Sequence, residues 1–328
     1  MTKPTPMSPW LRRFTKLVAA STLFLVFAGA MVTSTGSGLA VPDWPLSYGM
    51  LMPPMVGGIF YEHGHRMIAA TVGFLTVVQA IWIQLRDPRR FVRRLAWTSV
   101  GAVIVQGVLG GLTVIFLLPD AISVSHAALA EIFLCLNVAI AFYCARRVQS
   151  TGHPEEWSDE GSQNARPSHS EILRFAQDDR KRAYAIVAAL FIQVLLGALM
   201  RHREAGLAIP DFPLSFGRII PEFTSSAIAI NFAHRAWAVV VAVLILALAP
   251  RAMRSAGRSA YAILLTALGV QIVLGAFTVW TAKHPMVTSV HVMTGALMLA
   301  TSVVFALMIR SARRDEDKPA LALREVTA

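Results

Sequence analysis

The sequence predicts an all-α polytopic membrane protein whose eight transmembrane helices form two pseudo-symmetric four-helix bundles. The first observation behind this fold class is composition: the 328 residues are 55% apolar and only 15% charged, and their mean hydropathy is +0.56. Charged residues make up about a quarter of a typical soluble domain, so a soluble domain is excluded. The other two observations are eight apolar runs of membrane-spanning length and one long repeated motif.

A twelve-residue motif occurs twice and divides the chain into two related halves. Residues 38–49 read GLAVPDWPLSYG, and residues 206–217, which begin 168 positions later, read GLAIPDFPLSFG. Further features recur in the same order: His65-Arg66 with His234-Arg235, Gln106-x-x-Leu-Gly110 with Gln271-x-x-Leu-Gly275, and His126 with His291. Such a repeat indicates one structural unit used twice. An even number of spans per unit gives both halves the same orientation in the membrane.

The apolar runs define the predicted spans, and each is long enough to cross about 30 Å of hydrocarbon. In chain order they are 16–35, 65–85, 95–117, 122–145, 183–201, 230–249, 258–281 and 287–310. The first run follows Arg12, Arg13 and Lys16 and therefore resembles a secretory signal. Its apolar stretch is longer than a signal core and has a counterpart in the second half, so we interpret it as a retained helix.

The basic residues indicate which helix ends face the cytoplasm. The formal net charge is +11, and 24 of the 30 Lys and Arg residues fall in five segments. These segments are the N-terminus, every second loop and the C-terminus, namely 1–16, 86–94, 146–182, 251–258 and 310–324. Basic residues accumulate on the cytoplasmic side of membrane proteins, so both termini are predicted there and no nucleic-acid partner is expected. Arg201, Arg203 and Arg218 are exceptions in the third outer loop.

The predicted domain organisation follows from these boundaries. In order, the segments are a cytoplasmic N-terminus (1–16), an N-terminal bundle (17–145), a cytoplasmic linker (146–182), a C-terminal bundle (183–310) and a cytoplasmic tail (311–328). The linker is rich in Ser, Glu, Asp, Gln and Arg, a composition typical of flexible segments. A short helix is expected within it near 171–181.

Four histidines recur near the starts of spans that run from outside to inside. They are His65, His126, His234 and His291, and the repeat sorts them into a pair in each half. Ionisable groups inside a membrane are costly and tend to be functional. Two neutral imidazoles facing each other in a four-helix bundle suit a six-coordinate haem iron. Zinc requires three or four ligands and fits less well. Two haem sites in the outer half of the membrane are predicted, with structural polar contacts or a proton relay as the alternatives.

An arginine follows the first histidine of each pair. The guanidinium groups of Arg66 and Arg235 match carboxylates in a bidentate fashion and are candidate contacts for haem propionates. Arg201, Arg203 and Arg218 are candidates for the same role in the second half. The alternative is that these long side chains simply reach to the membrane surface.

The two halves differ in one residue beside the first histidine. Glu62 precedes His65 by three positions, whereas its counterpart before His234 is Asn231. Residues three apart share one helix face, so Glu62 is expected beside the group bound by His65. This acid suggests that the first half carries out chemistry, by proton transfer or by stabilising positive charge. The alternative is an acid favoured by the helix dipole. His63 is interpreted as incidental.

A second acid lies deeper in the fourth span. Glu131 is five residues after His126, and its counterpart in the second half is Ala296. A buried carboxylate without a partner is expensive. Glu131 is therefore expected to pair with a hydroxyl or to serve as a proton group.

These residues together resemble the haem A synthase family. The resemblance rests on Glu62-x-x-His65-Arg66, His126, Asn231-x-x-His234-Arg235, His291 and the paired loop motifs, and it covers roughly 17–310. It implies that His234 and His291 ligate a haem b cofactor and that His65 and His126 lie at the site of the substrate, haem O. It further implies that Glu62 is catalytic. Many members carry a cysteine pair in the first outer loop, whereas the two cysteines here lie in the fourth span.

The resemblance also implies a reaction and a location. The C8 methyl group of haem O would be oxidised through hydroxylation to a formyl group, giving haem A for terminal oxidases. The expected location is a bacterial-type cytoplasmic membrane. Candidate partners are haem O synthase, assembly factors of terminal oxidases, an unidentified membrane electron donor and a second copy of the chain. The alternatives are a di-haem b electron-transfer protein, which leaves Glu62 unexplained, and a haem transporter.

Overall fold

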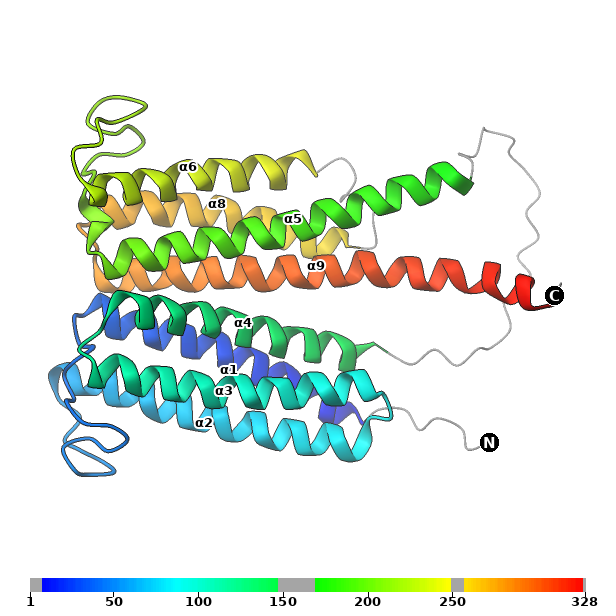
Figure 1. The fold of residues 1–328 in the computed structure, drawn as a ribbon, viewed down its shortest axis with the longest axis horizontal. Coiled ribbons are helices and arrows are strands. Elements are labelled where there is room, and N and C mark those ends of the chain that lie inside the picture. Colours follow the sequence, from blue (N-terminus) through cyan, green and yellow to red (C-terminus); the bar gives the residue numbers. More distant parts are fainter. Residues whose placement is uncertain (1–7, 147–168, 249–256, 327–328) are drawn as a thin grey trace.

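The computed structural model describes residues 8–146, 169–248 and 257–326, and the regular structure in these ranges is helical (Figure 1). The helices are α1 (Pro9–Ser34), α2 (Gly57–Arg86), α3 (Arg90–Ile115), α4 (Asp120–Ala145), α5 (His169–His202), the short 3₁₀ helix η1 (Ala205–Leu207), α6 (Ser226–Ala247), α8 (Arg258–Trp280) and α9 (Pro285–Val326). Figure 1 shows α1 to α4 gathered in one group and α5, α6, α8 and α9 in another. Between the groups, α1 and α4 pack against α9, and α4 also packs against α5.

Eight helices of the described ranges are long and apolar enough to cross a membrane. Their outer surfaces expose large apolar side chains such as Phe74, Leu85 and Val239. Such surfaces are typical of contact with lipid. The prediction of an all-helical, eight-span membrane protein is therefore confirmed. The symmetry relation between the two bundles stays a prediction.

Several helices extend beyond the apolar runs that predicted them. α2 begins at Gly57 rather than near residue 65, and α6 begins at Ser226 rather than near residue 230. The added turns contain polar residues that lower the hydropathy but still make helical backbone hydrogen bonds. α5 begins at His169, inside the range predicted for the linker, and α9 continues through most of the predicted tail. Residues 147–168 of the predicted linker lie outside the described residues.

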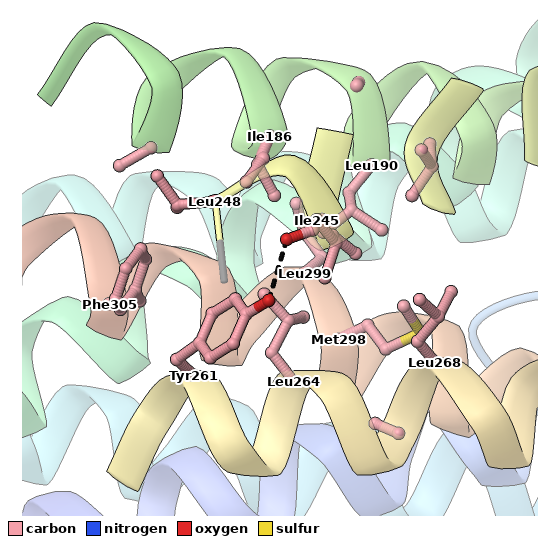
Figure 2. Close-up of a cluster of buried hydrophobic side chains, with 14 of the residues drawn as sticks. Ile186, Leu190, Ile245, Leu248, Tyr261, Leu264, Leu268, Met298, Leu299 and Phe305 are labelled. Carbon is pink, nitrogen blue, oxygen red and sulfur yellow. Dashed lines mark hydrogen bonds between the residues drawn. The ribbon is translucent and has the colours of Figure 1, made fainter. Parts of the chain in front are cut away.

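The C-terminal bundle is built around an apolar core. Figure 2 shows its centre, where Ile186 and Leu190 of α5, Leu264 of α8 and Leu299 of α9 converge. Tyr261 is fully buried among them, and its hydroxyl donates a 2.8 Å hydrogen bond to the backbone carbonyl of Ile245 (Figure 2). A buried tyrosine hydroxyl needs such a partner.

The N-terminal bundle has a polar centre instead. Asn137 of α4 accepts hydrogen bonds from Gln79 of α2 at 3.0 Å and from Ser99 of α3 at 3.2 Å, and it donates to Thr22 of α1 at 3.4 Å. All four side chains are buried. Through the repeat they correspond to Leu190, Leu248, Leu264 and Ser302. One buried network thus links all four helices of the N-terminal bundle, where interhelical hydrogen bonds replace part of the apolar packing.

Candidate functional site

The four repeated histidines lie at the same end of the molecule. His65 and His234 are each eight residues after the first residue of their helices, and His126 and His291 are each six residues after theirs. This end carries the long loops and lies opposite the start of α1 and the end of α9 (Figure 1). His65 and His126 belong to the N-terminal bundle, on α2 and α4, and His234 and His291 belong to the C-terminal bundle, on α6 and α9. Each bundle therefore holds two of the four histidines at this end, and their pairing at a common site stays a prediction.

Each imidazole lies against a glycine of the preceding long helix. A Cβ atom built on Gly29 would lie 3.0 Å from Cε1 of His65, and one built on Gly110 would lie 3.2 Å from Cε1 of His126. In the second half the corresponding distances are 3.1 Å between Gly197 and His234 and 3.3 Å between Gly275 and His291. Any larger residue would have to displace the ring. The repeating unit is thus a helical hairpin, with a glycine on its first helix and a histidine on its second.

A glutamine lies one turn before three of these glycines. The side-chain amide nitrogen of Gln106 lies 3.3 Å from Nε2 of His126. That of Gln193 lies 3.2 Å from Nδ1 of His234, and that of Gln271 lies 3.4 Å from Nε2 of His291. In the first hairpin this position is Leu25. The sequence analysis missed the third copy, although Gln193-Val-Leu-Leu-Gly197 repeats the Gln-x-x-Leu-Gly pattern.

The imidazoles fit the role of axial ligands to a haem iron. The Nδ1 atoms of His65, His126 and His291 are buried without a hydrogen-bond partner in the described part of the chain. Buried polar atoms are normally satisfied, so these require an explanation. A neutral imidazole that binds a metal through one nitrogen leaves the other for a second partner. Two such rings in one bundle, each backed by a glycine, suit a bis-histidine haem.

Glu62 is buried and holds the first outer loop. Its carboxylate accepts a 2.8 Å hydrogen bond from the backbone amide of Val41 and a 2.7 Å ion-paired bond from Arg66. Asn231, at the equivalent position of the second half, is a donor instead of an acceptor: its side-chain amide donates to the backbone carbonyls of Ala205 and Gly206. The helix dipole acts most strongly in the first turn of α2, and Glu62 lies beyond that turn. The two halves therefore differ in that the first has a buried acid paired with an arginine where the second has a neutral amide.

Arg66 and Arg235 bind the backbone of their own loops. Arg66 donates to the carbonyls of Val41, Asp43 and Leu46 at 3.2, 2.7 and 2.9 Å. Arg235 donates to those of Ile209, Asp211 and Leu214 at 2.8, 2.7 and 3.1 Å. The two loops are thus fastened over their histidine sites by the same set of contacts. The propionate role of both arginines stays a prediction.

An aspartate organises the turn in each of these loops. The amides of Gly49 and Tyr48 donate to Asp43 at 2.8 and 2.6 Å, and together they hold the pKa of its carboxyl below the usual value. Asp211 makes the same contacts with its own loop, and its pKa is lowered for the same reason. In the first loop, the turn lays Trp44 directly on the backbone of α3 at Gly111, where an added Cβ would lie 2.6 Å from the indole ring.

His63 has a structural role that the sequence analysis did not assign. Its side chain is buried, and its Nδ1 atom lies 2.7 Å from the hydroxyl of Ser47 in the first outer loop. Its counterpart Phe232 instead packs edge-on against Phe223. The first loop is therefore fastened by a hydrogen bond where the second is fastened by an aromatic contact.

Two of the three exceptional arginines lie between the bundles, whereas Arg218 forms an ion pair with Glu222 within its own exposed loop. Arg201 of α5 donates to the carbonyl of Ala30 and, at 2.7 Å, to the hydroxyl of Ser34, both in the last turns of α1. Arg203 forms an ion pair with Asp120 at the start of α4. Both therefore connect the C-terminal bundle to the N-terminal one. Their role toward propionates stays a prediction.

Glu131 faces a buried environment. Its side chain is 3% exposed, and its Oε2 atom has no hydrogen-bond partner among the described residues. The hydroxyl partner expected from the sequence is thus not seen for this atom. Its role as a proton group stays a prediction.

The fold and the paired sites define a class: a polytopic helical membrane protein with a histidine pair in each of two repeated units. Residues 56–303 match the family described as cytochrome oxidase assembly protein, and the chain belongs to this family.

Proteins named heme A synthase are similar to this chain over most of their length. The one from Symbiobacterium thermophilum is 31% identical over 240 residues, which cover 73% of this chain and 74% of that protein. The one from Shouchella clausii is 28% identical over 275 residues, or 82% and 85%. The one from Novosphingobium aromaticivorans is 25% identical over 357 aligned positions, or 92% and 96%.

Proposed function

We propose that this chain oxidises haem O to haem A. The observation that carries the proposal is that two equivalent histidine pairs differ by one buried acid, Glu62, for which the other half has Asn231. A protein that only passed electrons between two equivalent haems would have no need of this difference. The family membership and the relatives named heme A synthase support the same reaction.

The two pairs have different roles in this proposal. His65 and His126 hold the substrate haem O in the N-terminal bundle, and His234 and His291 hold a haem b cofactor in the C-terminal bundle. Haem b supplies one-electron transfer when bound. The substrate loses four electrons overall, as its C8 methyl group becomes a formyl group through hydroxylation.

Glu62 contributes a fixed negative charge beside the substrate. The ion pair with Arg66 and the amide of Val41 both favour the carboxylate form and prevent the side chain from turning. A preorganised charge stabilises positive charge that develops in a transition state, without a cost for reorganisation. The loop fastened by Arg66 and Trp44 covers the site and limits the entry of water.

The orientation follows from the charge distribution. The start of α1, the end of α9 and the Arg-rich turn between α2 and α3 share one end of the molecule (Figure 1). The histidines lie in the helix ends at the other side. The excess of basic residues supports a cytoplasmic location for the first end. The sites then lie in the outer half of a cytoplasmic membrane.

The test is to produce the chain together with a haem O synthase in a host that lacks haem A. Extracted haems are identified by chromatography and mass. The wild type is expected to give haem A and hydroxylated haem O. Glu62→Gln, which keeps the size of the side chain but removes its charge, is expected to lower product formation about 100-fold or more. It should leave the absorbance of the haem b site unchanged.

Two outcomes would contradict this proposal. A wild type that binds two haems b and forms no haem A would be an electron-transfer protein. Undiminished product in Glu62→Gln would remove this residue from the reaction.

A further inference from the structure

A groove of about 620 Å³ lies on the surface between α2 and α3, at the end of the molecule opposite the histidine sites. Gln84 and His65 are 19 positions apart on α2, a separation of about 28 Å at 1.5 Å per residue. One residue of α2 and five of α3 line the groove, namely Gln84, Arg90, Arg93, Arg94, Trp97 and Thr98. The indole nitrogen of Trp97 donates a 3.4 Å hydrogen bond to the side chain of Gln84, which joins the two walls.

The three arginines of this groove lack a negatively charged partner. In the described ranges, none of Arg90, Arg93 and Arg94 forms an ion pair. The neighbouring carboxylate, Asp87, is buried and binds Arg89 at 2.9 and 2.6 Å. A cleft lined by charges of one sign concentrates ions of the other sign. Guanidinium groups match phosphate oxygens in a bidentate fashion, so the groove suits a phosphate.

The groove continues into an apolar helix face. Residues 90, 94, 97, 104 and 108 follow one another at spacings of three, four or seven positions and therefore share one face of α3. Trp97, Ile104 and Val108 are all exposed on this face. Tryptophan is typical of the boundary between head groups and acyl chains. Along α3 the face thus changes from charged to aromatic to apolar, which is the order of head group, interface and acyl chain in a lipid.

The second half of the chain does not repeat this arrangement. Through the repeat, Arg90, Arg94 and Trp97 correspond to Ser255, Ser259 and Ala262. Arg93 alone keeps its charge, as Arg258. The combination of three basic residues and a tryptophan therefore belongs to the N-terminal bundle, and the general excess of basic residues at this end of the molecule does not account for it.

We propose that the groove between α2 and α3 binds the phosphate of an anionic phospholipid, whose acyl chains lie along the exposed apolar face of α3. Basic pockets between transmembrane helices bind anionic lipid head groups in this way. A soluble phosphate would use the arginines but not the apolar face beside them. Such a site does not depend on which reaction the histidine sites perform.

The test measures lipid binding to the full-length protein in detergent by native mass spectrometry. The wild type is expected to bind one phosphatidylglycerol at least about 10-fold more tightly than phosphatidylcholine, whose head group has no net charge. A variant that combines Arg90→Gln, Arg93→Gln and Arg94→Gln is expected to bind phosphatidylglycerol about 10- to 100-fold more weakly.

A matched control removes the same charge elsewhere. Arg12→Gln, Arg13→Gln and Lys16→Gln together change the first turns of α1, which lie at the same end of the molecule. This variant should keep the affinity for phosphatidylglycerol within about 2-fold. Arg94→Gln alone, at an exposed position, should weaken binding about 5-fold and serves if the combined α3 variant does not fold.

Thermal unfolding gives a second readout. A ligand that binds only the folded protein raises its unfolding temperature. Phosphatidylglycerol should therefore raise the unfolding temperature of the wild type and of the α1 variant, but not that of the combined α3 variant.

Three outcomes would overturn this inference. Equal affinities for phosphatidylglycerol and phosphatidylcholine would show that the arginines do not select a charged head group. Equal losses in the α1 and α3 variants would show a general attraction to the basic end of the molecule. Displacement of the lipid by millimolar inorganic phosphate would identify a site for a soluble anion.

Discussion

At the scale of single residues, the contact between glycine and histidine decides what each site can hold. A glycine lets the imidazole lie against the backbone of the neighbouring helix, which frees the centre of the bundle for a large flat group. Small residues allow such close approaches inside a membrane, where apolar side chains gain little from burial. Four repetitions of the contact in one chain make it a property of the repeating hairpin.

Gly275→Ala is expected to weaken haem b binding about 10-fold, and Gly275→Val to abolish it. The added Cβ would lie 3.3 Å from His291 and would push the ring toward the haem. Alanine favours helix over glycine by about 1 kcal/mol, so a weakened helix cannot be the cause. The measurement is the ratio of haem to protein after purification. Gly269→Ala is the control, because an added Cβ there meets no atom within 4 Å; equal losses in both variants would refute the contact.

At the scale of the elements, the two outer loops share the same internal contacts but are attached differently to the helices below them. Each has an aspartate that binds two amides and is fastened by an arginine that binds three carbonyls. The first loop differs in its attachment to the helix below it, where His63 bonds Ser47 and Glu62 bonds Val41. The second loop is attached instead through Asn231, which donates to Ala205 and Gly206, and through the contact of Phe232 with Phe223.

Asp43 is expected to make the order of the first loop depend on pH. Its pKa in the folded loop is lowered, so the stabilisation is fully present above the unfolded value of about 3.9 and is lost as the pH falls through the folded pKa. A nitroxide label at Leu51→Cys, an exposed position, should stay ordered between about pH 5 and pH 7. It should become mobile only at strongly acidic pH.

The variant Asp43→Asn removes the titrating group. Its label should be more mobile than that of the wild type near neutral pH and should lose the acid transition. Asp211→Asn, which changes the other loop, should leave the profile of this label unchanged. A transition that persists in Asp43→Asn would assign it to another group.

At the scale of the whole molecule, the two bundles are joined mainly through α1, α4, α5 and α9. Leu134 of α4 packs there with Ala296 and Ala300 of α9. Arg201 adds a polar connection near the outer end, where its positive charge meets the C-terminal turn of α1. A cation is favourable at this end of a helix dipole. The connection fixes the two sites relative to each other.

Arg201→Ala is expected to lower the free energy of unfolding by about 2 kcal/mol, because it leaves buried acceptors of α1 without their charged donor. Thermal unfolding in detergent measures the change. Arg203→Ala is the control, since its ion pair with Asp120 is partly exposed and is worth less than about 1 kcal/mol. Equal effects of the two substitutions would show that Arg201 is not the principal connection.

Much of the fold could be predicted because its signals are local. Apolar runs identified all eight spans, and the repeat identified His65, His126, His234 and His291 as equivalent positions at one end of the molecule. Helix starts were less certain, because the first turns of α2 contain Glu62 and His63 and are polar. The polar centre around Asn137 was not predicted, since its partners come from three other helices.

The sequence by itself determined the class of the protein, the number of its spans and which histidines recur between the two halves, because hydropathy and a repeated motif depend only on residues near one another in the chain. The tertiary structure alone decided what each of these residues touches. It placed Gly29 and Gly197 against His65 and His234, turned Arg66 and Arg235 to their loops, and showed that Gln193 and Leu25 occupy equivalent positions. Such contacts join distant segments, so they exist only once the helices have packed.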